Sequence, residues 1–360
     1  MIRYIFAVII IIHGLIHLMV FSKELGNSNR GISRPIKAIW LSTALSFVIA
    51  AVLFLLKVDS WSIIAMASAV LSQLLILSVW KAAKLGTILN VIIFFIAAAS
   101  FSIQYFEFQF EEEVRGQLHH SAVNNKDLLT EEDLRLLPQS VQKYLRLSGA
   151  VNKPKVKNMR VEFVGKMRTK GGNWFPFESV QYNFFDNPAR LFFMKAKMYG
   201  TTVPGYHDYQ NATARMDVKL FGLFTIIEES GIVMNISETV TVFNDMCLFA
   251  PATLIDKRIR WEEIDKDAVK ATFTNEGFQI SATLKFNKKG QLVNFISDNR
   301  YEINDMKQYR FSTPVKTYKK IHDLWMPTYG EAIWHYPEGE FVYGQFQLKD
   351  IDYNVNHFQK

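Results

Sequence analysis

The sequence predicts a membrane bundle of four transmembrane α-helices, followed by an α+β domain in water built as a curved antiparallel β half-barrel covered by one helix. Three observations predict this fold class. Four apolar stretches of near membrane-spanning length occupy residues 1–106. After residue 156 the hydrophobic period changes from 3.6 residues to 2. One apolar helix, about residues 235–250, interrupts the strands of the domain at 151–360, and residues 107–150 form a connector with short helices.

Each predicted span is close to the roughly 20 residues that a helix needs to cross the hydrocarbon core of a bilayer. The spans are Ile2–Phe21, Ala38–Leu56, Trp61–Trp80 and Gly86–Phe106. The links 57–60 and 81–85 are short, so the helices that they join should run antiparallel. Trp61 and Trp80 stand at span ends, where amphipathic rings favour the headgroup region.

The orientation of the bundle follows from the basic residues of its short loops, because cytoplasmic loops carry an excess of Lys and Arg. The first and third loops contain Lys23, Arg30, Arg34, Lys37, Lys81 and Lys84. The opposite side has only Arg3 and Lys57, and then an acidic run that begins at Glu107. We therefore expect a protein integral to the inner membrane, with both termini and the β domain outside the cytoplasm, in the periplasm of a Gram-negative cell.

The charge and cysteine content exclude several classes of function. The first 105 residues hold eight basic and two acidic residues, a net charge of +6 out of +7 for the whole chain. The basic charge thus belongs to the membrane part, and nucleic-acid binding, which needs a basic face on a folded domain, is not expected. Cys247 is the only cysteine, so neither an intrachain disulfide nor a Cys-rich metal site is possible. No cofactor is implied.

The first span contains one polar pair, His13 and His17, which lie on one helical face with Gly14 beside them. Ionisable groups inside a membrane suggest a metal site, a proton relay or a haem. A haem needs ligands on opposite faces, however, and a metal would lack an evident third ligand. We favour the alternative that both rings form hydrogen bonds with neighbouring helices, while Gly14 permits close packing. The candidate partners are Ser42, Thr43, Ser46, Ser72 and Gln73.

The domain shows strict alternation of apolar and polar residues, which predicts antiparallel strands with one dry and one wet face. The clearest strands are Met159–Arg168, Phe192–Met198, Ala212–Leu220 and Phe278–Phe286. Asn287–Gly290 is a turn that returns the chain as a hairpin through Gln291–Arg300. Further strands are predicted at Trp174–Phe185, Arg258–Ile264, Lys307–Tyr318, Thr328–Tyr336 and Phe341–Tyr353.

Three helical signals stand among these strands. Asn235 with Glu238 three residues later has the spacing of a capping box, and Pro251 ends the apolar stripe that follows. We expect this helix to lie across the dry, concave face of the sheet. A shorter helix, Gln139–Leu147, should end at Gly149. In front of it, Thr130 with Asp133 indicates another helix start, after a polar connector at 107–126.

The run Val141–Ala150 resembles the V-x-x-Y-L-R-x-x-G start of an uncharacterised bacterial domain family found on membrane-anchored proteins. Three later stretches are similar to that family as well. They are Asn211–Met216, Leu248–Leu254, and Ser312–Pro314 with Trp325–Thr328. The order of strands, apolar helix and strands resembles the periplasmic lipoprotein-carrier fold of LolA and its relatives, as does the hairpin Thr283–Leu292. That resemblance implies a half-barrel that holds acyl chains under its covering helix, although those carriers are soluble and this chain is tethered.

An apolar ligand under the covering helix would be lined by five Met and Phe side chains. They are Phe192, Met194, Met216, Phe243 and Met246. Flexible thioethers suit irregular acyl chains, but the same residues also suit plain core packing. The run Leu220–Ile227 is unusually apolar for a loop. It either continues a buried strand or forms a lip that touches the bilayer or a ligand.

No arrangement typical of catalysis is present: the sequence has no H-E-x-x-H, G-x-S-x-G, P-loop or dinucleotide glycine motif. The residues of His207-Asp208 should point to opposite faces of a strand, and His322-Asp323 suits a hairpin turn. An enzyme is therefore not expected.

Three hypotheses follow. The first is a binding module for a lipid, a lipoprotein acyl chain or another apolar ligand at the bilayer. The second is a scaffold or sensor of an envelope complex, joined to membrane-protein partners through a small-residue face of the third span. That face comprises Ala65, Ser68, Ala69 and Ser72. The third is an activity built on His13 and His17.

Overall fold

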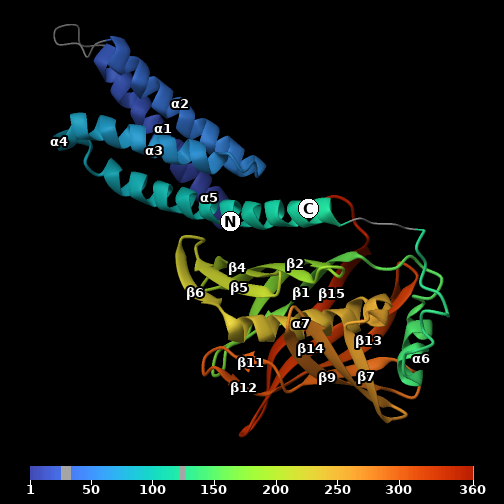
Figure 1. Cartoon of the computed structure of the whole chain (residues 1–360). Coiled ribbons are helices and arrows are strands. Elements are labelled where there is room, and N and C mark those ends of the chain that lie inside the picture. The colour runs from blue at the N-terminus through green and yellow to red at the C-terminus, as the bar shows by residue number, and fades with distance from the viewer. Residues whose placement is uncertain (26–33, 122–125, 360) are drawn as a thin grey trace. The chain divides into compact units, whose positions relative to one another are not determined.

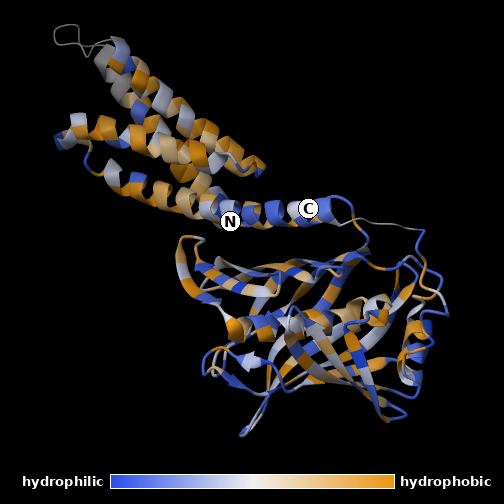
Figure 2. Ribbon diagram, in the orientation of Figure 1, coloured by the Kyte–Doolittle hydropathy of each residue, from blue (hydrophilic) through white to orange (hydrophobic). Residues whose placement is uncertain are grey.

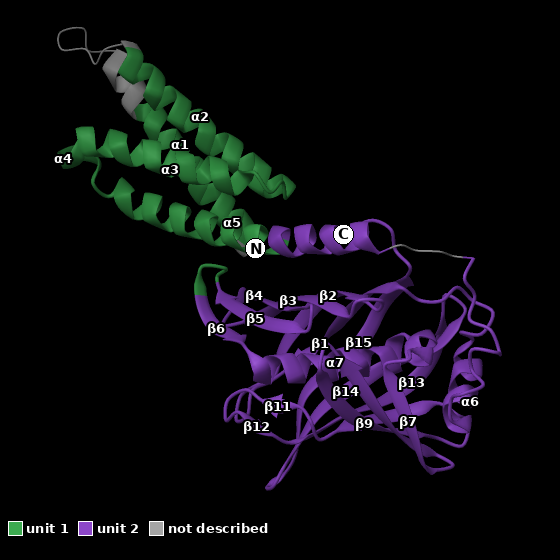
Figure 3. Cartoon of the chain, viewed as in Figure 1, with its two compact units in different colours: residues 1–107, 221–224 green, residues 108–220, 225–360 purple. Residues whose placement is uncertain are grey.

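The computed structural model describes residues 1–25, 34–121 and 126–359 (Figure 1). Its N-terminal helices are apolar along most of their length, whereas polar and apolar residues alternate along the strands that follow (Figure 2). The chain divides into two compact units (Figure 3). Unit 1 comprises residues 1–107 together with 221–224, and unit 2 comprises residues 108–220 and 225–360.

Unit 1 is a helical bundle. Its helices are α1 (Ile2–Leu25), α2 (Arg34–Leu56), α3 (Trp61–Ser78), α4 (Trp80–Ala83) and the first part of α5 (Gly86–His120). Among the described residues, three helices are long and apolar enough to cross a membrane, namely those over Pro35–Leu56, Trp61–Ser78 and Gly86–His120. The apolar part of α1 that can be described, Arg3–Met19, is shorter, so the fourth span stays a prediction. Much of the predicted first loop, including Arg30, lies outside the described residues.

Small residues let the helices of unit 1 approach closely. A Cβ added to Gly14 on α1 would lie only 2.9 Å from Cβ of Phe47 on α2. The small face of α3 (Ala65, Ser68, Ala69 and Ser72) is buried inside this bundle. Ser68 donates a hydrogen bond to Oγ of Ser46 at 2.8 Å. The idea that this face is a seam for partner helices is therefore wrong, because the chain's own helices occupy it.

Unit 2 is built on one large antiparallel sheet. Its strands are β1 (Asn158–Met167), β2 (Phe175–Phe184), β3 (Ala189–Met198), β4 (Thr201–Gln210), β5 (Thr213–Leu220), β6 (Phe224–Ser230), β7 (Ile259–Asp265), β8 (Ala268–Asn275), β9 (Phe278–Phe286), β10 (Leu292–Ser297), β13 (Arg310–Ile321), β14 (Leu324–Tyr336) and β15 (Gly339–Tyr353). Their order is β6-β5-β4-β3-β2-β1-β15-β14-β13-β10-β9-β8-β7. A small pair, β11 (Tyr301–Glu302) and β12 (Lys307–Gln308), stands apart. The sheet curves but does not close, because β6 and β7 remain as its edges (Figure 1).

The strands predicted from alternation are present, but β4 and β8 were not predicted. In β4 the consecutive residues 203–206 are all buried, so the alternation that marks a half-exposed strand is missing. The turn before β10 is confirmed: Gly290 donates its N–H to the carbonyl of Asn287 at 2.8 Å. The turn between β13 and β14 is confirmed as well, with φ of 44° and 68° at His322 and Asp323.

Helix α7 (Ile232–Phe249) and the 3₁₀ turn η1 (Pro251–Ile255) join β6 to β7, so the chain crosses from one sheet edge to the other. The helix lies inside the curve of the sheet, as Figure 1 shows. The predicted capping box is wrong, because α7 begins three residues earlier, after Gly231. Oδ1 of Asn235 instead accepts the N–H of Ala214 on β5 at 2.7 Å, which ties the helix to the strand.

The predicted connector is helical over residues 107–120, as the C-terminal part of α5. Apolar residues at helical spacing (Phe106, Phe110, Val114 and Leu118) are buried along one side of it. Within unit 2 the ring of Phe110 stacks on Phe193 of β3 and meets Tyr206 of β4, at centroid distances of 5.5 and 5.6 Å. The outer face of the sheet is therefore dry here. This is why Phe193 is buried although it alternates with Phe192 and Met194, which were predicted on the dry face.

The short helical signals have separate outcomes. Helix α6 (Gln139–Ser148) is present and ends at Gly149, whose φ of 77° suits the left-handed position of a helix C-cap. Thr130 and Asp133 do form the predicted contact, with the N–H of Thr130 donating to Oδ2 of Asp133 at 2.8 Å. The residues after them form turns instead of a helix.

Candidate functional site

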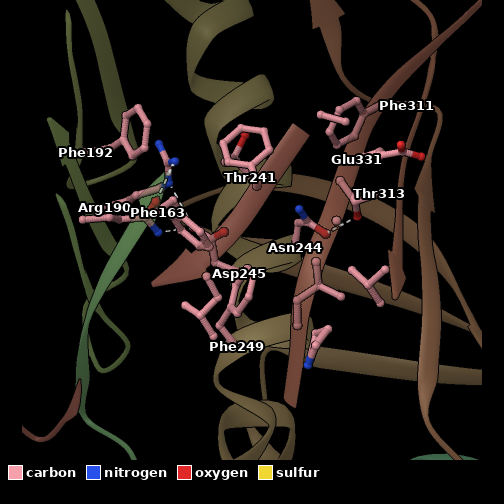
Figure 4. Close-up of a pocket in the computed structure, with 18 of the residues that line it drawn as sticks. Phe163, Arg190, Phe192, Thr241, Asn244, Asp245, Phe249, Phe311, Thr313 and Glu331 are labelled. Carbon is pink, nitrogen blue, oxygen red and sulfur yellow. Dashed lines mark hydrogen bonds and ion pairs between the residues drawn. The ribbon is translucent and has the colours of Figure 1, made fainter. Parts of the chain in front are cut away.

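A cavity lies between α7 and the inner face of the contiguous strands β4-β3-β2-β1-β15-β14-β13 (Figure 4). Its volume is about 140 Å³. An engineered apolar cavity of about 150 Å³ binds benzene, so this space has room for a short apolar fragment and not for a whole lipid. The apolar side chains that line it include Phe163, Met167, Phe192, Met194, Leu248, Phe249, Phe311, Val315, Phe346 and Leu348.

Two of the five residues predicted to line a ligand site reach this cavity. Phe192 and Met194 do so together, because alternate residues of β3 share one face. Met216, Phe243 and Met246 belong to the same hydrophobic core but are not among the lining residues. On α7, Phe243 faces away from the cavity and stacks on Phe273 of β8, at a centroid distance of 5.2 Å.

Two consecutive residues of α7 attach the helix to opposite walls of the cavity. Asn244 accepts a hydrogen bond from Oγ1 of Thr313 on β13 at 2.8 Å, as Figure 4 shows. Asp245 pairs with Arg190 on β3, where Nε lies 3.0 Å from Oδ2. Because the two walls are far apart in the strand order, these contacts hold the helix across the curve of the sheet.

Arg190 is the centre of a buried polar cluster. Besides Asp245 it binds Glu238, with Nη1 3.2 Å from Oε2, and it donates from Nη2 to Oε1 of Gln181 at 2.9 Å. Glu238 and Asp245 are seven residues apart, so both point from the same side of α7. Asn183 donates a further hydrogen bond to Asp245 at 3.1 Å. This cluster was not predicted from the sequence, although two acidic residues at this spacing on an apolar helix were a signal for it.

The electrostatics of the cluster differ between its two carboxyl groups. Burial by itself would raise the pKa of Glu238, but Arg190 and then His207, 3.6 Å away, lower that pKa to about 2. Burial raises the pKa of Asp245, although Arg190 and two amide donors oppose the shift. Glu238 is therefore charged at neutral pH and balances the guanidinium of Arg190.

A second guanidinium lines the cavity. Arg300 lies over the rings of Phe311 and Trp334, with its central carbon 4.2 and 5.4 Å from their centroids. It donates a hydrogen bond to the hydroxyl of Tyr343 at 2.9 Å. The guanidinium of Arg300 therefore contacts aromatic rings on one side and faces the cavity on the other. An apolar ligand with a polar end would meet both kinds of group here.

The remaining chemistry-bearing residues do not converge on one site. His207 lines the cavity, whereas the neighbouring Asp208 accepts a hydrogen bond from Gln210 at 2.8 Å, on the other face of β4. In the described part of the chain, no group of three or more His, Cys, Asp or Glu residues is arranged to hold a metal ion. Cys247 is buried.

The predicted polar pair of α1, His13 and His17, contacts two neighbouring helices of unit 1. The Nε2–H of His13 donates to Oδ1 of Asn90 on α5 at 2.7 Å, and Nε2 of His17 lies 2.9 Å from Oγ of Ser72 on α3. Ser72 was among the predicted partners, whereas Asn90 was not. Asn90 donates in turn to Oε1 of Gln73 at 3.0 Å. Within the described residues, Nδ1 of each histidine has no hydrogen-bond partner.

A family model matches residues 127–346, which is more than half of the chain and most of unit 2. The chain belongs to the family of unknown function DUF6544. No curated protein matches this DUF6544 chain.

Two solved structures are similar to the DUF6544 chain. One is a DUF1329 family protein from Desulfovibrio piger, with 10% identity and a TM-score of 0.36, covering 60% of this chain and 92% of that one. The other is a LolA superfamily protein from Nitrosomonas europaea, with 8% identity and a TM-score of 0.34 at the same coverages.

Proposed function

We propose that this DUF6544 protein is a membrane-tethered binding module whose extracytoplasmic domain holds an acyl chain or another apolar ligand beside the bilayer. The observation that carries the proposal is the cavity between α7 and the sheet. Protein interiors are normally close-packed, yet Phe and Met side chains on both walls leave about 140 Å³ unfilled. A space of this kind, apolar with a few polar groups at its edge, is typical of a ligand site.

The membrane helices supply the location of this activity. The basic residues of the first and third loops favour a cytoplasmic position for those loops, which supports an extracytoplasmic position for the domain. Because α5 runs from Gly86 to His120 without a break, the domain follows directly after an apolar helix.

The size of the cavity sets the affinity that it can provide in this conformation. About six buried carbons, each contributing about 0.8 kcal/mol, give about 5 kcal/mol. That free energy corresponds to a Kd between about 0.1 and 1 mM. Tighter binding of a whole acyl chain therefore requires α7 to move away from the strands, or the polar end of the ligand to engage Arg300.

Crosslinking tests the proposal on the full chain in its native membrane. A phospholipid with a diazirine in its acyl chain should label the peptides that carry Phe192 and Met194. Thr241 lines the cavity from α7, so Thr241→Trp fills the space and should reduce the labelling severalfold. The matched control is Thr213→Trp, at an exposed position of β5. Labelling confined to residues 1–107, or unchanged in Thr241→Trp, would refute the proposal.

The alternative is a scaffold or sensor subunit of an envelope complex that binds no ligand. The modest volume of the cavity is the observation that favours it, because an imperfectly packed core would look similar. Crosslinking in intact membranes separates the two functions. A stoichiometric protein partner, together with no acyl labelling of unit 2, would support the scaffold.

A further inference from the structure

Two hairpin turns lie side by side at one end of the sheet. β3 and β4 are joined at 199–200, where Met198 pairs with Thr201. β5 and β6 are joined at 221–223. β3 pairs antiparallel with β4, β4 pairs antiparallel with β5, and β6 follows β5 in the sheet order. Both turns therefore fall at the same end of the sheet. We call residues 199–200 and 221–224 the paired tips.

The paired tips expose large apolar side chains to solvent. Tyr199 is 86% exposed and Phe224 is 55% exposed. The surface continues along β6 and into the start of α7 through Ile226 and Ile232, the latter 68% exposed. Single exposed apolar residues are ordinary on a protein surface. Phe224, Ile226 and Ile232 within nine residues, beside Tyr199 in the neighbouring turn, instead indicate an interaction site.

The turn geometry does not account for the aromatic residues. Tyr199 and Gly200 both have positive φ, of 53° and 75°, and so do Phe221 and Gly222, of 57° and 70°. The first position of such a turn favours Asn, Asp or Gly, because bulky side chains are strained in the left-handed region. Each tip nevertheless carries an aromatic residue there. In the second tip the ring of Phe221 packs on Phe95 of α5 within unit 1, at a centroid distance of 5.6 Å. In the first tip Tyr199 is 86% exposed, and this points to a function for its ring.

Charge is distributed in the way that a lipid surface requires. Lys197 and Lys219 stand within two residues of the tips, where long basic side chains can reach phosphate groups while their stems lie against apolar surface. The acidic residues of β6 begin at Glu228, which at about 3.3 Å per residue is roughly 13 Å along the strand from Phe224. The residues at the paired tips are thus apolar, the next residues along each strand are basic or neutral, and acidic residues come only farther from the tips.

We propose that the paired tips insert into the outer leaflet of the bilayer in which the chain's own helices are embedded. A Tyr ring near a lysine, as at Tyr199 and Lys197, is characteristic of the interface between headgroups and acyl chains. The lipid surface is the occupant that the chain itself provides, because the tip at 221–224 belongs to unit 1 and its Phe221 packs on Phe95 of the apolar part of α5. Insertion is a contact additional to the ligand site under α7, and it does not depend on that site.

Nitroxide accessibility tests the insertion on the full chain in lipid nanodiscs. Cysteines are introduced singly as Tyr199→Cys or Leu223→Cys and labelled. The buried Cys247 of the parent chain should take up no label. The control is Leu136→Cys, at an apolar residue of unit 2 that is 96% exposed and outside the tips. Collision rates are measured with oxygen, which concentrates in the bilayer, and with a water-soluble nickel chelate.

We expect the ratio of oxygen to nickel accessibility at both tip positions to exceed that at Leu136 severalfold. A tip label as accessible to the nickel chelate as the Leu136 label would overturn the proposal. Shielding of the Tyr199 label from both reagents would overturn it too, since it indicates contact with protein instead of lipid. If that shielding grows with the number of chains in each nanodisc, the contact is with a second copy.

A substitution in one tip tests whether the two act together. With the label at Tyr199, Leu223→Ser combined with Phe224→Ser should lower the oxygen to nickel ratio toward the value for water. Ile264→Ser, at an exposed position of β7 away from the tips, is the matched control and should leave the ratio unchanged. Equal ratios in the tip variant and in the control would contradict joint insertion.

Discussion

Arg190 on β3 and Asp245 on α7 form a buried ion pair, with Nε 3.0 Å from Oδ2, at the wall of the cavity. The pair fixes the position of the covering helix relative to the strands. A helix that joins the two edges of an open sheet needs such a contact, because backbone hydrogen bonds do not connect it to either wall. The contact also makes α7 sensitive to single substitutions.

Replacement of Arg190 with Leu should destabilise unit 2 by about 3–5 kcal/mol, because two buried carboxyl groups lose their cation. The measurement is urea unfolding of the full chain in nanodiscs, followed by tryptophan fluorescence. Arg310→Leu is the control, since Arg310 and Asp298 form an exposed pair worth less than about 1 kcal/mol. Equal losses in the two variants would show that the buried cluster does not hold the helix.

Asp208→Asn should stabilise the protein at pH 7 and leave it unchanged at pH 4. Burial is the main reason that the pKa of Asp208 rises from 3.8 to about 6, and repulsion from Glu113 adds to it. Since the folded state then holds this proton more tightly, stability falls as pH rises from about 4 to 6. The substitution removes that loss, by about 1–2 kcal/mol once partial exposure of the carboxylate is allowed for.

Urea midpoints of Asp208→Asn and the parent chain at both pH values check this sign. Asn keeps an oxygen that accepts the hydrogen bond from Gln210, so the contact at 2.8 Å survives the substitution. A variant that is less stable than the parent at pH 7 would mean that the surroundings stabilise the carboxylate, contrary to the raised pKa of Asp208.

His13→Ala combined with His17→Ala should loosen the membrane bundle by about 1–2 kcal/mol, because hydrogen bonds between membrane helices contribute about 0.6 kcal/mol each on average and ring packing is lost as well. The rings also contact Phe47, at centroid distances of 5.0 and 5.9 Å. Unfolding of the helices by SDS titration measures the loss. Ser42→Ala is the control, because its hydroxyl donates to Ile39 of its own helix.

The same variant addresses the role of the pair. If the bundle keeps its stability while acyl labelling of unit 2 disappears, the histidines act in function and not in packing. If stability falls and labelling by the diazirine lipid persists, the hydrogen bonds to Ser72 and Asn90 are structural.

Much of the sheet could be predicted from the sequence, because a strand with one buried face shows its period directly. The strand β9 alternates without exception from Phe278 to Phe286, and it was predicted with its observed bounds. Where both faces are buried the signal disappears. In β4, Tyr206 is covered by α5 on the outer face of the sheet. Its hydroxyl donates a hydrogen bond to Glu113 of α5, which lies 93 residues earlier in the chain. Local patterns carry no information about such a cover.

The ligand site was less predictable for the same reason. Phe192 lines the cavity and Phe243 fills the core, yet both are apolar residues at regular positions of their elements. Which of the two side chains lines the cavity depends on the rotation of α7 about its own axis. That rotation is set by the contacts of Asn244 and Asp245 with strands 69 and 55 residues away along the chain.

Truncation of Phe243 and truncation of Phe192 should destabilise unit 2 by different amounts. Phe243→Ala should cost about 3–5 kcal/mol, because the side chain is fully buried and packs against Phe273 and Phe295. Phe192→Ala should cost less, about 1–3 kcal/mol, since one side of the ring already faces unfilled space and has fewer contacts to lose.

The same truncation should affect binding at one of the two positions only. Phe192→Ala enlarges the existing cavity, so labelling of β3 by the diazirine lipid should increase and should extend to a longer part of the acyl chain. Phe243→Ala opens a separate void on the other side of α7 and should leave that labelling unchanged in molecules that remain folded. If the two variants change labelling equally, the site does not distinguish the two sides of α7, and the cavity beside Phe192 is not where the acyl chain binds.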